Sequence, residues 1–182
     1  MRPLIIAVEG IDGAGKSVAA EAAARVLGTE PVHFAAPEAY PGGHSGLFAA
    51  ARALLAEAVE NPGAPVLLDR GWASMWVYAH TRHSAPEAAA EAERFYVEVA
   101  RCAMPRTWHM SRKLGKCHEA DPQWSAELLA RERVMFHMWA NSHPTATAHF
   151  SNYYSSLPRL EQRAEQLAQR ELRNWRLHEC TT

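Results

Sequence analysis

The chain has 182 residues, of which 48% are hydrophobic and 21% are charged, as expected for a globular protein with one domain and a real core. Nineteen Lys and Arg residues against 20 Asp and Glu residues give a formal net charge of −1 at pH 7. This balance excludes a strongly basic body that binds nucleic acid through bulk electrostatics.

Short apolar runs alternate with helix-forming segments along the chain. Buried strands are expected over residues 4–8, 31–34, 65–68, 107–110 and 147–151. Helices are expected over residues 16–27, 47–59, 72–82, 84–103, 121–140 and 156–177. Residues 36–46 predict a loop, and residues 111–120 predict a polar, basic and irregular segment. This alternation predicts an α/β fold with a five-stranded parallel sheet between layers of helices, in a single domain over residues 1–182.

The cysteines and the start of the chain bear on the cellular compartment. Cys102, Cys117 and Cys180 are scattered and odd in number, which favours reduced thiols and a cytoplasmic location. The first residues lead directly into a strand and have the features of neither a signal peptide nor a transit peptide. No apolar run approaches the roughly 20 residues that cross a membrane, so we expect no membrane partner.

The strongest motif lies between the first predicted strand and the first predicted helix, and it matches the phosphate-binding loop pattern. It consists of Gly10-Ile11-Asp12-Gly13-Ala14-Gly15-Lys16-Ser17. Glycines let backbone N–H groups curl around a phosphate, and the helix N-terminus adds its dipole. Lys16 is expected to reach the β- and γ-phosphates, and Ser17 is expected to offer its hydroxyl to Mg²⁺. We therefore expect ATP and Mg²⁺ as cofactors.

A second motif, Asp69-Arg70, ends the strand predicted over residues 65–68. A carboxylate at the carboxyl end of a buried strand lies at the ligand edge of an open α/β sheet. Asp69 could hold Mg²⁺ directly or through water. Arg70 is suited to a phosphate, because its guanidinium donates two hydrogen bonds at once.

Three segments together resemble the thymidylate kinases. Residues 8–17 are similar to the phosphate loop of that family, and Leu47-Phe48-Ala49-Ala50-Ala51-Arg52 is similar to its nucleobase helix. Asp69-Arg70, followed by Ser74 and Tyr78 at the family's offsets, resembles its Asp-Arg motif. The resemblance covers residues 4–28 and 47–80, and it implies the three-layer P-loop kinase fold.

The resemblance also implies a role for each matched residue. Asp12 would lie near the 3′-hydroxyl of the acceptor sugar, and Arg70 would hold the acceptor phosphate. Phe48 would stack on the nucleobase, and Arg52 would donate a hydrogen bond to it. Tyr78 would face the sugar, and Ser74 would belong to the same acceptor site. Like its relatives, the chain could form a homodimer.

A basic segment after the fourth predicted strand contains Arg112, Lys113 and Lys116. Kinases of this fold close a basic lid over the transferring phosphoryl group, whose oxygens need positive charge around them. Some relatives have an Arg in the phosphate loop where this chain has Gly13. We therefore expect residues 111–121 to form the lid, with Arg112 as a catalytic cation, and residues 1–110 and 141–182 to form the core.

These observations favour ATP-dependent, Mg-assisted phosphoryl transfer to a small-molecule acceptor, a deoxynucleoside monophosphate. The alternative is a kinase of a neutral hydroxyl, either on a deoxynucleoside or on a hydroxymethylated pyrimidine in DNA, with Glu38 or Asp12 as the base. DNA is a partner only under this alternative. A non-catalytic nucleotide-binding module is a third interpretation, and the presence of Lys16, Ser17 and Asp69 argues against it.

Overall fold

A parallel sheet of five strands forms the centre of the structure, a computed structural model that describes residues 1–120, 123–143, 147–151 and 156–179. The strand order is β2-β3-β1-β4-β5. The strands are β1 (Leu4–Glu9), β2 (Pro31–His33), β3 (Val66–Asp69), β4 (Met104–Ser111) and β5 (Thr147–Ser151). The helices are α1 (Lys16–Leu27), η1 (Pro37–Ala39), α2 (His44–Glu60), α3 (Trp72–Thr81), α4 (Pro86–Cys102), α5 (Leu114–Ala120), α6 (Ala126–Ser142) and α7 (Leu157–Glu179). The predicted α/β class, with a five-stranded parallel sheet flanked by helices, is confirmed.

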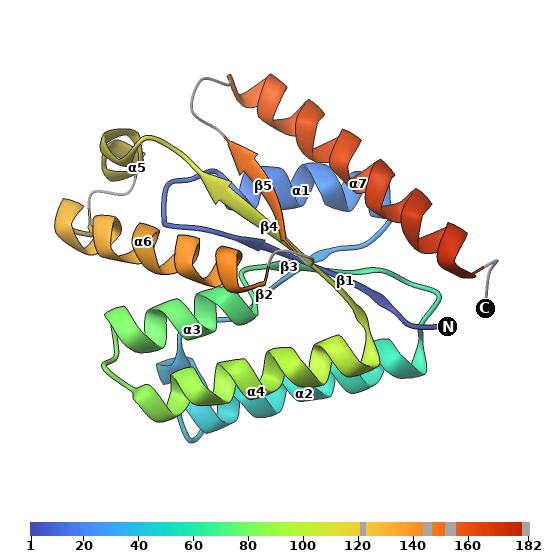
Figure 1. The fold of residues 1–182 in the computed structure, drawn as a ribbon, viewed down its shortest axis with the longest axis horizontal. Helices are drawn as coiled ribbons and strands as arrows, with labels where there is room; N and C mark the ends of the chain where they lie inside the picture. Colours follow the sequence, from blue (N-terminus) through green and yellow to red (C-terminus); the bar gives the residue numbers. More distant parts are fainter. Residues whose placement is uncertain (121–122, 144–146, 152–155, 180–182) are drawn as a thin grey trace.

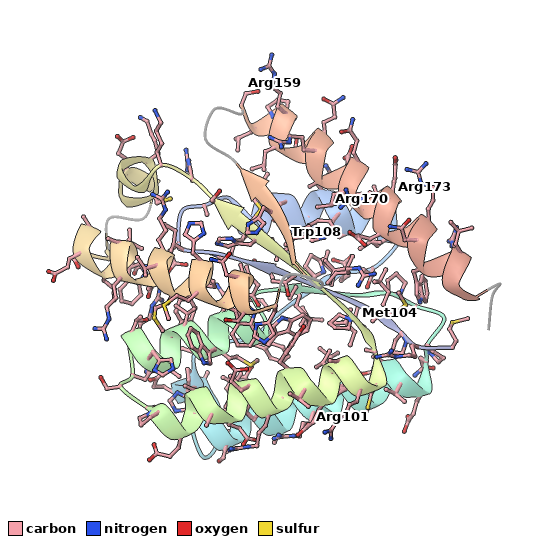
Figure 2. The ribbon with its side chains drawn as sticks, viewed as in Figure 1. Arg101, Met104, Trp108, Arg159, Arg170 and Arg173 are labelled. Carbon is pink, nitrogen blue, oxygen red and sulfur yellow. The ribbon has the colours of Figure 1, made fainter. Side chains whose placement is uncertain are left out.

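The helices cover both faces of the sheet. Figure 1 shows α1 and α7 packed together on one face, and α2, α3, α4 and α6 on the other. Alanines on α1 are buried against the sheet, which brings this helix close to β1. On β4, Met104 is partly buried and Trp108 is fully buried, whereas Arg159, Arg170 and Arg173 follow the exposed side of α7 (Figure 2).

The central strand β1 sets the position of the loop that follows it. All six of its residues are buried, and it pairs in parallel with β3 on one side and β4 on the other. In this register Val8 lies opposite both Asp69 and Trp108. Because parallel strands end at the same edge of a sheet, the phosphate loop and the Asp69-Arg70 turn emerge side by side.

The segment predicted as irregular contains a helix. Residues 114–120 form α5, and the buried Cys117 lies directly against Gly13 of the phosphate loop. The sequence pattern did not predict this helix, which packs against α6 and against a loop about a hundred residues away. The next helix, α6, begins later than predicted, since the Ser125 side chain caps it by accepting from the Leu128 N–H. The predicted cap Asp121, which is also the predicted end of the lid, lies outside the described residues.

The thiols and the helix lengths bear on two further expectations. Cys102 is exposed and Cys117 is buried, and both are free thiols, while Cys180 lies outside the described ranges. Across the described part of the chain, none of the helices combines the length and the apolar character that a bilayer crossing requires.

Replacing Gly10 tests the close approach of the phosphate loop to β4. Gly10 has φ +141°, and an added Cβ would lie 2.4 Å from the Met110 carbonyl oxygen. Gly28 also has a positive φ, +68°, but an added Cβ would meet nothing within 4 Å. We expect Gly28→Ala to cost about 1–2 kcal/mol of unfolding free energy through backbone strain. We expect Gly10→Ala to cost about 1–3 kcal/mol more through the clash.

Urea denaturation of the two variants and the wild type measures these losses. Equal losses at the two positions would contradict the close approach of Gly10 to β4.

Candidate active site

The phosphate loop has the conformation that an anion-binding loop needs. Gly13 and Gly15 have left-handed φ angles of 73° and 92°, and Lys16 begins α1. The Lys16 ammonium is buried, and it donates to the Ile11 carbonyl at 2.9 Å. Burial, with Arg70 nearby, lowers the pKa of Lys16 to about 8, although neighbouring carboxylates oppose the shift. The lysine is thus desolvated before any phosphate arrives.

Ser17 and Asp69 form a set of oxygen ligands that fits Mg²⁺. The Ser17 hydroxyl donates to Asp69 Oδ2 at 2.8 Å, which brings the end of β3 to the start of α1. The other carboxylate oxygen, Asp69 Oδ1, is buried and has no hydrogen-bond partner within the described residues. Mg²⁺ prefers oxygen ligands and keeps several of its waters, so an unsatisfied carboxylate oxygen beside a hydroxyl matches its needs.

The buried carboxylate of Glu9 fixes the turn after β3. It accepts hydrogen bonds from the N–H groups of Gly71, Ala73 and Ser74 at 2.9–3.1 Å, and also from the Ser74 hydroxyl. Burial raises the pKa of Glu9 to about 7, and these hydrogen bonds limit the rise. The start of α3 therefore has three of its free backbone N–H groups satisfied from β1. The Ser74 hydroxyl is directed at Glu9, although the residue also lines the cavity described below.

Arg70 lies over the phosphate loop in a left-handed conformation, with φ 76°. Its Nη2 lies 2.5 Å from Asp12 Oδ1, and its Nη1 donates to the Tyr78 hydroxyl. Burial alone would raise the pKa of Asp12, but Lys16, Arg70 and Arg82 outweigh it and hold the pKa at about 2. Asp12 is therefore ionised at neutral pH, and it lies among three cations.

Arg82, which the sequence analysis did not single out, is part of the same cluster. Its Nη2 donates to Asp12 Oδ2 at 2.7 Å, and its Nε and Nη2 both donate to the fully buried Glu132 of α6. Its guanidinium carbon lies 3.8 Å from the centre of the Tyr78 ring and 4.1 Å from that of Trp124. One arginine thus joins the phosphate loop, α3, α6 and the segment before α6.

A periodic signal could have pointed to Arg82. Ser74, Tyr78 and Arg82 follow one another at intervals of four, which places them on one face of a helix. The first two of these belonged to the motif that carried the resemblance, so the third lay one helical turn further along the same face.

A cavity of about 570 Å³ opens beside this cluster. Its walls include Phe48 of α2, Met75 and Tyr78 of α3, Arg70 and Glu38. Phe48 is almost fully buried, so it can offer only part of its ring to a ligand. The apolar walls and the few charged groups at one end are typical of a small-molecule site.

Two of the residues predicted for the site, Arg52 and Glu38, are not part of the Asp12 cluster. Arg52 points to α4, where it pairs with Glu91 at 2.5 Å and with Glu98 at 2.8 Å, and it is not among the described residues that line the cavity. Glu38 lines the rim with its side chain 70% exposed, and it lies 3.4 Å from His83 Nδ1.

The segment predicted to form the lid contacts the phosphate loop through Arg112. Its Nη1 donates to the Gly13 carbonyl at 2.8 Å. Lys116 pairs with Glu119 at 2.7 Å, one turn along α5. Of these two cations, Arg112 is the one that the structure places at the phosphate loop.

Comparisons with known proteins place this geometry in a fold class. No protein-family model matches the chain, and no curated protein matches it. Among solved structures 113 chains match, and the fold is that of the P-loop kinases, as the sequence predicted. One of these is deoxyadenosine kinase from M. mycoides with bound dCTP, at a TM-score of 0.55 and 13% sequence identity. The match covers 94% of this chain and 100% of that one.

Replacing Glu9 by Gln tests its role at the start of α3. The amide N–H₂ of a glutamine would face donors and would leave at least one of them unsatisfied. We expect a loss of about 1–3 kcal/mol in unfolding free energy. The exposed Glu21 provides a control, because Glu21→Gln should change stability by less than about 0.5 kcal/mol. Denaturant titration of both variants measures the difference, and a Glu9→Gln variant as stable as the control would contradict this role.

Proposed function

We propose that this protein transfers the γ-phosphoryl group of ATP to a deoxynucleoside monophosphate with the help of Mg²⁺. The observation that carries the proposal is the position of Arg70, which lies beside Lys16 and Asp12 and also lines the cavity. An acceptor phosphate bound by Arg70 would lie next to a donor phosphate bound by Lys16. Phosphoryl transfer depends mainly on such positioning and on charge stabilisation.

The charges favour an anionic acceptor over a neutral hydroxyl. Arg70 is largely buried and belongs to the wall of the cavity, so an anion that reaches it gains a charge-assisted hydrogen bond away from bulk water. A neutral hydroxyl would instead need a base. Asp12 has a pKa of about 2, which makes it a weak proton acceptor at neutral pH. Glu38 is mostly exposed at the rim.

The rest of the cavity suits a nucleoside. Phe48 and Met75 supply apolar surface for a planar base, and Tyr78, whose hydroxyl accepts from Arg70, would face the sugar. Arg52 has no part in this proposal, because two glutamates of α4 hold its guanidinium.

Four side chains in and around the phosphate loop would have separate tasks in the proposed reaction. Lys16 would leave the Ile11 carbonyl to bind the donor phosphates, and Arg112 would stabilise charge on the transferring group. Ser17 and Asp69 would hold Mg²⁺, which supplies charge neutralisation at the β- and γ-phosphates when bound.

A kinase of a neutral hydroxyl is the second candidate, and one observation favours it. Glu38 is a carboxylate on the rim of the cavity, where it could take a proton from an acceptor hydroxyl. The structurally similar deoxyadenosine kinase also makes a deoxynucleoside acceptor plausible. A hydroxymethylated pyrimidine in DNA belongs to the same alternative.

Replacing Lys16 tests the phosphate-loop assignment. We expect Lys16→Ala to lower the rate of ADP release about 10²–10³-fold, because the ammonium acts on charge that develops in the transition state. Thermal unfolding should show an intact fold. Arg25→Ala, an exposed change on the same helix, is the control and should keep wild-type turnover. Near wild-type turnover in Lys16→Ala would disprove the assignment.

Arg70 and Glu38 separate the two candidate reactions. If the acceptor is a monophosphate, Arg70→Ala should raise its KM about 10–100-fold, the value of a charged hydrogen bond. Glu38→Gln should then leave kcat nearly unchanged. If the acceptor is a neutral hydroxyl, Glu38→Gln should lower kcat about 10²–10⁴-fold.

The measurement is ADP release with a panel of deoxynucleoside monophosphates, free deoxynucleosides and DNA that carries hydroxymethylated pyrimidines. Turnover with the monophosphates alone supports the first reaction. Turnover with free deoxynucleosides or with the DNA, and none with the monophosphates, would overturn it.

A further inference from the structure

The Asp12 carboxylate is almost fully buried, and three cations share it. Lys16 lies 3.5 Å from Oδ1, Arg70 lies 2.5 Å from the same oxygen, and Arg82 lies 2.7 Å from Oδ2. One negative charge thus has three positive partners, which is more than it needs for neutrality.

Two of these cations are the groups that the substrates require. This step depends on the proposed function, in which Lys16 binds the donor phosphates and Arg70 binds an acceptor phosphate. Both side chains would then turn from Asp12 to the more highly charged phosphates. A buried carboxylate that loses its partners is strongly destabilised, and negative phosphates beside it add repulsion. Asp12 therefore needs a cation that remains beside it when both substrates are bound.

Arg82 has partners other than Asp12 that can keep its guanidinium in place when substrates bind. The fully buried Glu132 accepts two hydrogen bonds from its guanidinium, and Tyr78 and Trp124 cover the two faces of that group. The Arg82 side chain is only 13% exposed. The remaining edge of its guanidinium points at Asp12 Oδ2. Unlike Lys16 and Arg70, it has a second carboxylate partner, Glu132, which is fully buried and is not among the described residues that line the cavity.

We propose that Arg82 is a positioning residue that holds and neutralises the Asp12 carboxylate after the substrates have taken Lys16 and Arg70. Oδ2 stays on Arg82, and Oδ1 becomes available to a hydrogen-bond donor of the reactants. A lysine would not replace this arginine, because a single ammonium lacks the planar set of donors that serves Glu132 and Asp12 together.

Several ionisable groups surround Asp12, and the test must separate Arg82 from the others. They are Lys16 on α1, Arg70 after β3, Tyr78 on α3, Arg82 after α3, Cys117 on α5 and, through Arg82, Glu132 on α6. Replacing Arg82 alone would leave Glu132 buried without its partner and could unfold the protein. The variant of choice is therefore Arg82→Met/Glu132→Leu, which removes both charges together.

The first experiment follows ionisation of Asp12 directly, by ¹³C NMR of the carboxyl signal that Asp12→Asn removes, with and without Mg–ATP and deoxynucleoside monophosphate. We expect Arg82→Met/Glu132→Leu to raise the pH midpoint of this signal by about 1 or more, a tenfold change in proton affinity. The control is Arg106→Met/Glu171→Leu, a similar ion pair between β4 and α7, and it should titrate like the wild type. An unchanged midpoint in the Arg82 variant overturns the inference, whatever the activity.

The second experiment measures kcat and KM with the monophosphate that the wild type uses best. A role in positioning predicts that Arg82→Met/Glu132→Leu lowers kcat about tenfold or more, while both KM values stay within about threefold. In this variant the loss of kcat should also grow as the pH falls toward the raised midpoint of Asp12. An unchanged kcat would overturn the inference. Absence of turnover in the wild type itself would count against the proposed function, and the titration would still decide the role of Arg82.

Discussion

The hydrogen bonds of the Glu9 carboxylate hold the two halves of the site together. Glu9 ends the central strand, and it accepts from three backbone N–H groups in the first turn of α3 and from the Ser74 hydroxyl. The turn between β3 and α3 is fixed to the strand that leads into the phosphate loop. Arg70, in that turn, is thereby placed over Asp12. The position of Arg70 relative to the phosphate loop follows from this one buried group.

In the proposed reaction, substrate phosphates would replace internal ion pairs of the site. Lys16 and Arg70 are held by Asp12, and Lys16 also by the Ile11 carbonyl, so neither cation is buried without a partner. Substrate phosphates would replace these partners, which reduces the net cost of desolvating them. Arg82 differs because its second carboxylate partner, Glu132, is fully buried on α6 and is not among the described residues that line the cavity. In the proposed reaction two cations of the cluster would move and Arg82 would stay.

The segment predicted as the lid and the walls of the cavity come from parts of the chain far from the phosphate loop, and both lie beside this cluster. Arg112 donates to the Gly13 carbonyl, so the start of the lid contacts the loop that it would serve. The α5 helix lies against the same glycine, which leaves no space there for a Cβ. On the other side, Phe48 and Tyr78 form cavity walls between α2 and α3.

The sequence by itself determined the strand, loop and helix that carry Lys16 and Ser17, because these elements are contiguous and their conformations depend on local residues. It also determined the position of Arg70, since a carboxylate and an arginine at the end of a buried strand must lie at the ligand edge. Only the tertiary structure decided the partners of Arg52 and Arg82. Arg52 lies on α2 and Arg82 directly follows α3, and their carboxylate partners come from residues far away in the chain. Pairing of charges depends on which helices pack together, and no local pattern encodes it.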